Sequence, residues 1–171
     1  MARVTARYII SRAQGISGLY GMGGCGTGSY LEKDPETGKY TVAVFDPNNL
    51  RWDCSGFVGY CCGAPRGTHG FGAGGWYTGD MGHFRGVNKL AQLGLKDISD
   101  KVNFTTGEGM KAGDILIYNE PGSDGAGAKG HTEIYWGERL TLGARGGNGT
   151  PVGVGIPGGG TTSLVRANLF Q

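Results

Sequence analysis

The first apolar pattern along the chain is that of a helix. Within residues 2–14, Val4, Tyr8 and Ile9 recur at helical spacing, which places them on one face. Gly15 follows as a natural stop, because glycine is common just after the last helical residue. We therefore predict a helix over this segment.

A β-hairpin is the next predicted element, after a glycine-rich loop over residues 18–29. In residues 30–45 apolar and polar side chains alternate, as they do in a strand with one buried face. The predicted arms are Tyr30–Lys33 and Lys39–Phe45, joined by the turn Asp34–Gly38. The residues after the hairpin, Asp46 to Asn49, have the composition of another turn.

The rest of the chain predicts two more helices and a set of apolar strands. Residues 54–62 have the pattern of a buried helix that begins at Asp53, and residues 81–94 that of an amphipathic helix after a loop over 63–80. The predicted strands are Ile115–Tyr118, Thr132–Trp136, Leu140–Ala144 and Ser163–Phe170. The second and third of these are expected to pair across Gly137-Glu138, and residues 146–160 to form a glycine-rich loop.

Length and charge narrow the class of protein. The 171 residues fit a single domain, residues 1–171, with inserted loops near residues 25–50 and 63–86. Glycine accounts for 37 residues without a three-residue period, which indicates many turns and excludes collagen. The net charge is +2 and the basic residues are scattered, so we expect no nucleic-acid partner, whereas an anionic polymer such as a cell wall would suit the chain.

We expect neither a signal peptide nor a membrane-spanning segment. The N-terminal apolar run is short and is interrupted by Arg3, Arg7 and Arg12, so it does not resemble a signal peptide. The sequence contains no apolar stretch of 18 residues, which predicts no membrane span. We expect synthesis in a cytoplasm and delivery by another agent if the protein acts outside it.

The cysteine pattern argues against both disulfides and metal. The four cysteines are Cys25, Cys54, Cys61 and Cys62, and two of them are adjacent. The chain has neither C-x-x-C nor H-x-x-x-H spacing, so we expect reduced thiols, no metal and no cofactor. Cys61 and Cys62 lie about two helical turns after Cys54, where burial as small apolar residues is the expected state.

Cys54 is the best candidate for a nucleophile. Asp53 is a good N-cap residue, so Cys54 would lie in the first turn of the predicted helix. The partial positive charge of a helix N-terminus favours a thiolate, which is the reactive form of cysteine. Gly56 leaves room for another segment to approach, and the first-turn N–H groups can donate to an oxyanion.

His131 is the best candidate for a general base. It follows Gly130 and precedes an apolar strand, a position that would hold its ring on a rigid element. An imidazole with an ordinary pKa can take a proton from a thiol at neutral pH. The other two histidines, His69 and His83, lie in or beside the glycine-rich insertion and are the less favoured candidates.

Four motifs occur in order along the chain. They are Tyr20-Gly21-Met22-Gly23-Gly24, Asp53-Cys54-Ser55-Gly56-Phe57-Val58, Gly113-Asp114 and Gly130-His131. Together they resemble the NlpC/P60 family of cell-wall cysteine peptidases and amidases. The resemblance covers about residues 4–145, and the residues from His131 to Trp136 look most like the phage endolysin branch. It implies an α+β, papain-like fold, in which N-terminal helices include a nucleophile helix that packs on an antiparallel sheet. It also implies Cys54 as nucleophile, His131 as base, Tyr20 near the oxyanion, and Asp53 and Ser55 as supporting residues.

The residue that orients His131 departs from the family pattern. The family takes it from the next strand, but pairing across Gly137-Glu138 would put Ala144 opposite His131, with Arg145 beside it. Arginine has no acceptor for an imidazole N–H. Strand alternation favours Glu133 instead, with Asn148 and a bare Cys–His dyad as the other hypotheses. A solvated or substrate-facing carboxylate is an equally good interpretation of Glu133.

The sequence therefore predicts a bacteriolytic, endolysin-like peptidoglycan hydrolase. It would cut an amide bond of the stem peptide through a thioester, as an endopeptidase or an N-acetylmuramoyl-L-alanine amidase. Phage lysis, virion entry and delivery as an effector all fit a leaderless chain, with a holin, a tail or a secretion apparatus as the partner that supplies wall binding or delivery. The alternatives are an inactive binding or phage tail module and a permuted acyltransferase, against which Cys54 preceding His131 argues.

Overall fold

Helix α1 (Ala6–Gln14) opens a computed structural model that describes residues 4–63, 94–118, 131–145, 149, 151–155 and 163–167. The Thr5 side chain caps α1 by accepting a hydrogen bond from the Tyr8 N–H at 3.1 Å, and Gly15 closes its other end. The predicted helix is confirmed, although it begins at Ala6 rather than at residue 2, because the chain is extended at the Thr5 cap.

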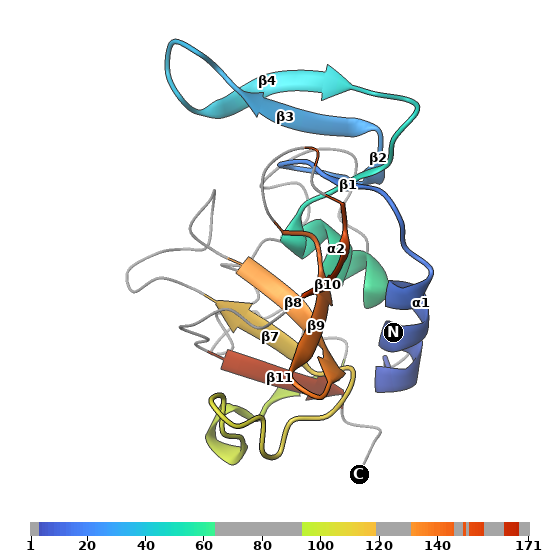
Figure 1. Ribbon diagram of the computed structural model, residues 1–171, viewed down its shortest axis with the longest axis vertical. Coiled ribbons are helices and arrows are strands. Elements are labelled where there is room, and N and C mark those ends of the chain that lie inside the picture. Colours follow the sequence, from blue (N-terminus) through green and yellow to red (C-terminus); the bar gives the residue numbers. More distant parts are fainter. Residues whose placement is uncertain are drawn as a thin grey trace.

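Helix α2 (Cys54–Cys61) begins where the sequence predicts. The Asp53 carboxylate accepts a hydrogen bond from the Gly56 N–H at 2.7 Å, which satisfies one of the donors that a helix start leaves without a partner. Seven of its eight residues are buried, and it packs against α1 and against the main sheet (Figure 1). The α2 helix is therefore held in place from several sides.

The main sheet has six antiparallel strands among the described residues. Their order is β10-β9-β8-β7-β11-β6. The strands are β6 (Leu95–Asp97), β7 (Ile115–Tyr118), β8 (His131–Gly137), β9 (Leu140–Gly143), β10 (Gly153–Gly155) and β11 (Ser163–Ala167). The four strands predicted from the sequence are confirmed as β7, β8, β9 and β11, with small differences in their bounds. Strands β6 and β10 and the short 3-10 helix η1 (Ser99–Lys101) were not expected, since each has only three residues.

A smaller sheet corrects the predicted glycine-rich loop over residues 18–29. Strands β1 (Leu19–Tyr20) and β2 (Cys25–Thr27) lie in this segment, on either side of β5 (Arg51–Trp52). The pairing of β1 with β5 is parallel and that of β2 with β5 antiparallel. The sequence does not signal these strands because two or three residues are too few to show an alternating pattern.

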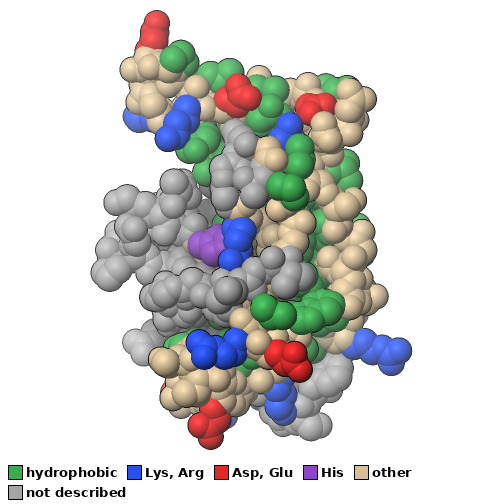
Figure 2. Space-filling view, viewed as in Figure 1, with side chains coloured by type: hydrophobic (Ala, Val, Ile, Leu, Met, Phe, Trp, Pro, Cys, Tyr) green, Lys and Arg blue, Asp and Glu red, His purple; other side chains and the backbone are tan. Residues whose placement is uncertain are grey.

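The predicted hairpin is present and stands apart from the main sheet. Strands β3 (Ser29–Lys33) and β4 (Tyr40–Phe45) pair antiparallel, and the Asp46 N–H donates to the Gly28 carbonyl at 2.9 Å across its base. In Figure 1 the hairpin lies on the far side of α2 from the main sheet. Figure 2 shows charged and hydrophobic side chains interspersed on its surface, and most of its residues are exposed.

The core lies between the two helices and the sheet. Ile9 of α1, Phe57 and Val58 of α2, and Ile115 and Ile134 of the sheet are fully or almost fully buried in one cluster. On another side of the sheet, Leu116 and Tyr135 pack with Ile98. No described helix is long and apolar enough to cross a membrane. The predicted loop over 63–80 and helix over 81–94 lie outside the described residues, apart from Gly63 and Gly94.

Candidate active site

Asp53 joins two of the sequence motifs at the start of α2. Its carboxylate is 2% exposed, and besides capping the helix it accepts from the Ser55 hydroxyl at 3.3 Å. Its second oxygen accepts from the Gly23 N–H at 3.0 Å. Because all three donors come from nearby backbone or a short side chain, Asp53 fixes Cys54 relative to the Tyr20–Gly24 segment.

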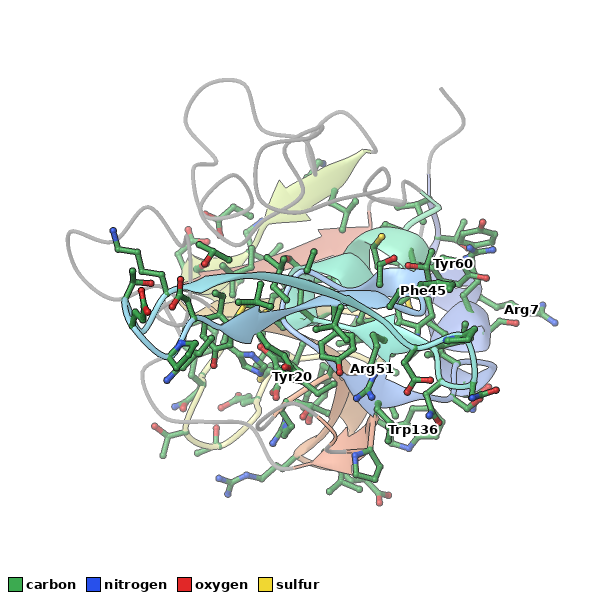
Figure 3. All side chains as sticks on the ribbon, turned by 90° about the horizontal axis from the view of Figure 1, so that it is seen from above. Arg7, Tyr20, Phe45, Arg51, Tyr60 and Trp136 are labelled. Atoms are coloured by element: carbon green, nitrogen blue, oxygen red, sulfur yellow. The ribbon has the colours of Figure 1, made fainter. Side chains whose placement is uncertain are left out.

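The Tyr20–Gly24 segment runs directly beside the approach to α2. Tyr20 pairs with Trp52, and the Asp53 N–H donates to the Gly24 carbonyl at 2.9 Å. A Cβ at Gly24 would lie 2.7 Å from the Arg51 carbonyl group, closer than real Cβ contacts come. Glycine is therefore required at position 24. Figure 3 shows Tyr20 and Arg51 beneath the hairpin.

His131 and Glu133 meet at the beginning of β8. The His131 Nε2 lies 2.8 Å from the Glu133 Oε1, as a bent-back glutamate two residues along the strand can allow. Glu133 is 1% exposed, so it is neither solvated nor a surface carboxylate. An ionised carboxylate only accepts, so this contact assigns the Nε2 proton to His131 and leaves Nδ1 as the basic ring nitrogen.

Arg145 reaches the same carboxylate from the other side. Its Nη2 donates to the Glu133 Oε1 and, at 2.6 Å, to the Thr141 hydroxyl. The expected pairing of Ala144 with His131 is wrong, because the chain turns at Glu138-Arg139, both with positive φ, and not at Gly137-Glu138. A bulge between Tyr135 and Gly137 offsets only part of that change, so Ile134 pairs with Leu142. Continued to the end of β9, that register brings Arg145, rather than Ala144, level with His131.

The elements that carry Cys54 and His131 pack against each other. Helix α2 contacts strand β8, and in Figure 1 the N-terminal end of α2 lies near the first residues of β8. The Gly113-Asp114 motif secures β8 from the side of β7. The Gly113 N–H donates to the Tyr135 carbonyl at 2.8 Å, and the Tyr135 N–H to the Asp114 carbonyl at 2.7 Å. This motif therefore supports the strand from outside the site.

The remaining predicted residues divide into two groups. All four cysteines are buried and none forms a disulfide. Burial raises the pKa of Cys61 and raises that of Cys62 to about 12, which fits inert core residues. Asn148, His69 and His83 lie outside the described residues. Within the described part of the chain, no three His, Cys, Asp or Glu side chains are grouped so as to hold a metal ion.

Two contacts at the site were not anticipated from the sequence. One is the hydrogen bond from the Gly23 N–H to Asp53, and the other is the ion pair between Arg145 and Glu133. The glycine at position 23 is a sequence signal for the first contact, because glycine readily adopts a left-handed φ, and Gly23 has a φ of 76°. Nothing in the local pattern signalled the second, because it depends on where the chain turns between β8 and β9 and on the bulge in β8.

Comparisons with known proteins identify the fold. No family model matches the chain, and no curated protein matches it. The P60 domain of an antigen of Mycobacterium avium subspecies paratuberculosis is similar over 97% of this chain and 96% of its own, with 20% identity and a TM-score of 0.50.

Two solved structures of longer chains show the same similarity. A variant of RipA, the resuscitation promoting factor interacting protein, substituted at a histidine, is 25% identical with a TM-score of 0.53. A hypothetical invasion protein of Mycobacterium tuberculosis is 24% identical with a TM-score of 0.55. The similarity covers 95% of this chain in both cases, and the chain spans 61% of each of theirs. The chain therefore has the fold of the NlpC/P60 domains, α+β and papain-like, as its four motifs predicted.

Proposed function

We propose that the chain is a peptidoglycan hydrolase that cleaves an amide bond of the stem peptide. The observation that carries the proposal is the arrangement of α2 on β8. A capped helix begins at Cys54 and packs on a strand whose first residue, His131, is hydrogen bonded to a buried carboxylate. This is the arrangement that a cysteine nucleophile and its base require.

The reaction follows from the ring nitrogen that Glu133 leaves for catalysis. Nδ1 of His131 takes the Cys54 thiol proton, and the sulfur attacks the amide carbonyl to form a tetrahedral oxyanion. Collapse of this intermediate breaks the C–N bond, and the imidazolium gives its proton to the departing amine. A water molecule, deprotonated by His131, then attacks the thioester, and the acid leaves while Cys54 regains its proton.

The neighbouring residues have separate roles in this proposal. The first-turn N–H groups of α2 and Tyr20 stabilise the oxyanion. Asp53 and Ser55 hold the start of the helix, and Glu133 orients His131. Arg145 in turn balances the charge of Glu133.

The substrate class rests on the motifs and the fold together. The four motifs resemble those of cell-wall hydrolases, and the fold is that of the NlpC/P60 domains. Solved RipA variants carry substitutions at a cysteine and a histidine, the two residue types found here at Cys54 and His131. A glutamate substituted in a third variant lies 12 positions after that histidine, so it does not correspond in spacing to Glu133. A phage or secretion apparatus would deliver the chain to the wall.

Clearing of a suspension of purified cell walls tests the proposal. Wild-type protein should lower the turbidity, and Cys54→Ala should abolish the effect. Cys54→Ser should lose at least about 10³-fold in rate, because a hydroxyl is far less acidic than a thiol. The far-ultraviolet circular dichroism of both variants should match the wild type. Clearing at the wild-type rate by Cys54→Ser would contradict the assigned nucleophile, and wall binding without clearing by the wild type would favour an inactive binding module.

A further inference from the structure

A groove lies along the hairpin and reaches Gly23 in the Tyr20–Gly24 segment. It has a volume of about 430 Å³, which falls within the roughly 300–1,000 Å³ usual for small-molecule sites. It is lined by Gly23, Ser29, Tyr30, Leu31, Ala43, Val44 and Phe45. Apart from Gly23, these residues belong to β3 and β4, so the groove is a property of the hairpin. We name it the hairpin groove.

One face of the hairpin supplies most of the side chains in the hairpin groove. Ser29 pairs with Phe45, and Leu31 pairs with Ala43, so these four side chains lie on the same face of the two strands. The opposite face carries Tyr30 and Val44, which also line the groove, and the Glu32–Val42 pair, which does not. Val42 can therefore be substituted without changing a lining residue.

The hairpin is fixed to the segment that supports Cys54. The Leu31 N–H donates to the Met22 carbonyl at 2.7 Å, which joins β3 directly to the Tyr20–Gly24 segment. Gly23 lines the groove and also donates its N–H to Asp53, the cap of α2. A ligand in the hairpin groove would thus contact Gly23, which belongs to the hydrogen-bond network that positions Cys54.

The chemistry of the lining favours an uncharged ligand with an apolar face. None of the seven lining residues carries a charge, and most of the side-chain surface is hydrocarbon. Phe45 is 68% exposed, the most exposed of the large hydrophobic side chains that the structure describes. Large apolar side chains left in water on a concave surface commonly mark a binding site, and an exposed aromatic ring can stack on the C–H face of a sugar. Figure 3 shows Phe45 at the base of the hairpin rather than at its tip.

We propose that the hairpin groove binds an N-acetylated sugar of the glycan strand, next to the stem peptide that the active site cuts. This inference rests on the proposed function. The sugars of the strand are neutral, which matches the uncharged lining, whereas the charged groups of the stem peptide would find no partner among the lining residues. The ring of Phe45 stacks on the sugar, and the hydroxyl of Ser29 lies on the same face to accept or donate a hydrogen bond.

A pair of substrates separates sugar recognition from catalysis. One is the stem peptide attached to its disaccharide, and the other is the same peptide without sugar. Phe45→Ala should lower kcat/KM on the first substrate about 10-fold, mainly through KM, and leave the second unchanged. Val42→Ala is the matched control, because Val42 is 41% exposed on the opposite face of the hairpin. Equal effects of Phe45→Ala on both substrates, or none on either, overturn the proposal.

A binding measurement keeps the inference separate from the proposed function. In the Cys54→Ala background, calorimetry with peptide-free glycan strands, whose lactyl carboxylates have been converted to amides so that the strands stay neutral, should show binding that Phe45→Ala weakens about 10-fold and that Val42→Ala leaves intact. If the wild type cuts neither substrate, the proposed function fails, and this measurement still decides the groove. Equal affinity of the Phe45→Ala and Val42→Ala variants for the strands, or no binding by either, overturns the sugar site.

Discussion

Glu133 illustrates how a buried charge is held in this protein. Removal of a carboxylate from water costs several kcal/mol unless cationic or polar partners replace the water. Here the His131 ring and the Arg145 guanidinium both reach the same oxygen, and Arg145 is itself held by Thr141. Arg145 therefore acts on His131 through Glu133, although it cannot accept the imidazole N–H itself.

Replacement of Glu133 by glutamine tests this arrangement. We expect Glu133→Gln to lower activity about 10–100-fold, the range usual for a residue that orients a functional histidine. Activity on the stem peptide measures the effect.

The comparison variant for this prediction is Asn148→Ala, which should have the smaller effect. If Glu133→Gln kept full activity and Asn148→Ala lost most of it, the orienting residue would be Asn148. If both variants kept full activity, the site would be a dyad held by backbone alone.

The four thiols should differ in their reaction with iodoacetamide at pH 6–7. Cys54 should be labelled first, since it is the proposed nucleophile at the start of α2. Cys61 and Cys62 should stay unmodified in the folded protein, because burial raises the pKa of both thiols and keeps them protonated well above neutral pH. Peptide mapping after short exposure measures the order, and labelling of Cys25 ahead of Cys54 would count against the assigned nucleophile.

Strand alternation predicted part of the site but could not predict all of it. It correctly put Glu133 on the same face as His131, two residues along one strand. It misplaced Ala144 and Arg145, because the turn lies at Glu138-Arg139, one residue later than predicted, and a bulge in β8 offsets only part of that difference. A bulge adds a residue to one strand without an obvious mark in the sequence, so contacts across it depend on the folded backbone.

At the scale of elements, glycine decides how closely β1, β2 and β5 approach. Gly24→Ala should destabilise the fold by roughly 1–3 kcal/mol, the cost usual for overpacking, because its Cβ would meet the backbone of Arg51 and Trp52. We also expect lower activity, since the Gly24 carbonyl accepts from the Asp53 N–H. Urea denaturation measures the change in the free energy of unfolding. Gly153→Ala is the control, because no atom lies within 4 Å of a Cβ there, and an equal loss in both variants would refute the packing argument.

Element length explains which parts of the fold the sequence could predict. Helices α1 and α2 have caps at Thr5 and Asp53, and β4 alternates over six residues, so each carries its own signal. Strands β1, β5 and β10 have two or three residues and exist because a neighbour supplies their hydrogen bonds. Such strands are defined by tertiary contacts, which no local pattern records.

At the scale of the whole molecule, the sheet joins segments from distant parts of the chain. Strand β11 pairs with β7 on one side and with β6 on the other, so it lies inside the sheet although it comes last in sequence. Strands β7 and β8 are in turn paired with each other, and β8 carries His131. The position of the candidate base therefore depends on residues more than 30 positions further along the chain.

Truncation of the chain before β11 tests that dependence. A chain that ends at residue 162 lacks β11, so β6 loses its partner and β7 keeps only β8. The exposed edge of β7 would carry three isoleucine or leucine residues that are buried in the full chain, Ile115, Leu116 and Ile117, an arrangement that favours aggregation. We expect the truncated chain to lose the cooperative thermal transition seen by circular dichroism and to lose wall hydrolysis with it. A chain that ends at residue 167 keeps every strand of the sheet and should retain both. If the shorter chain melted cooperatively at the temperature of the longer one, β11 would be dispensable and the sheet would be held by β7 to β10 alone.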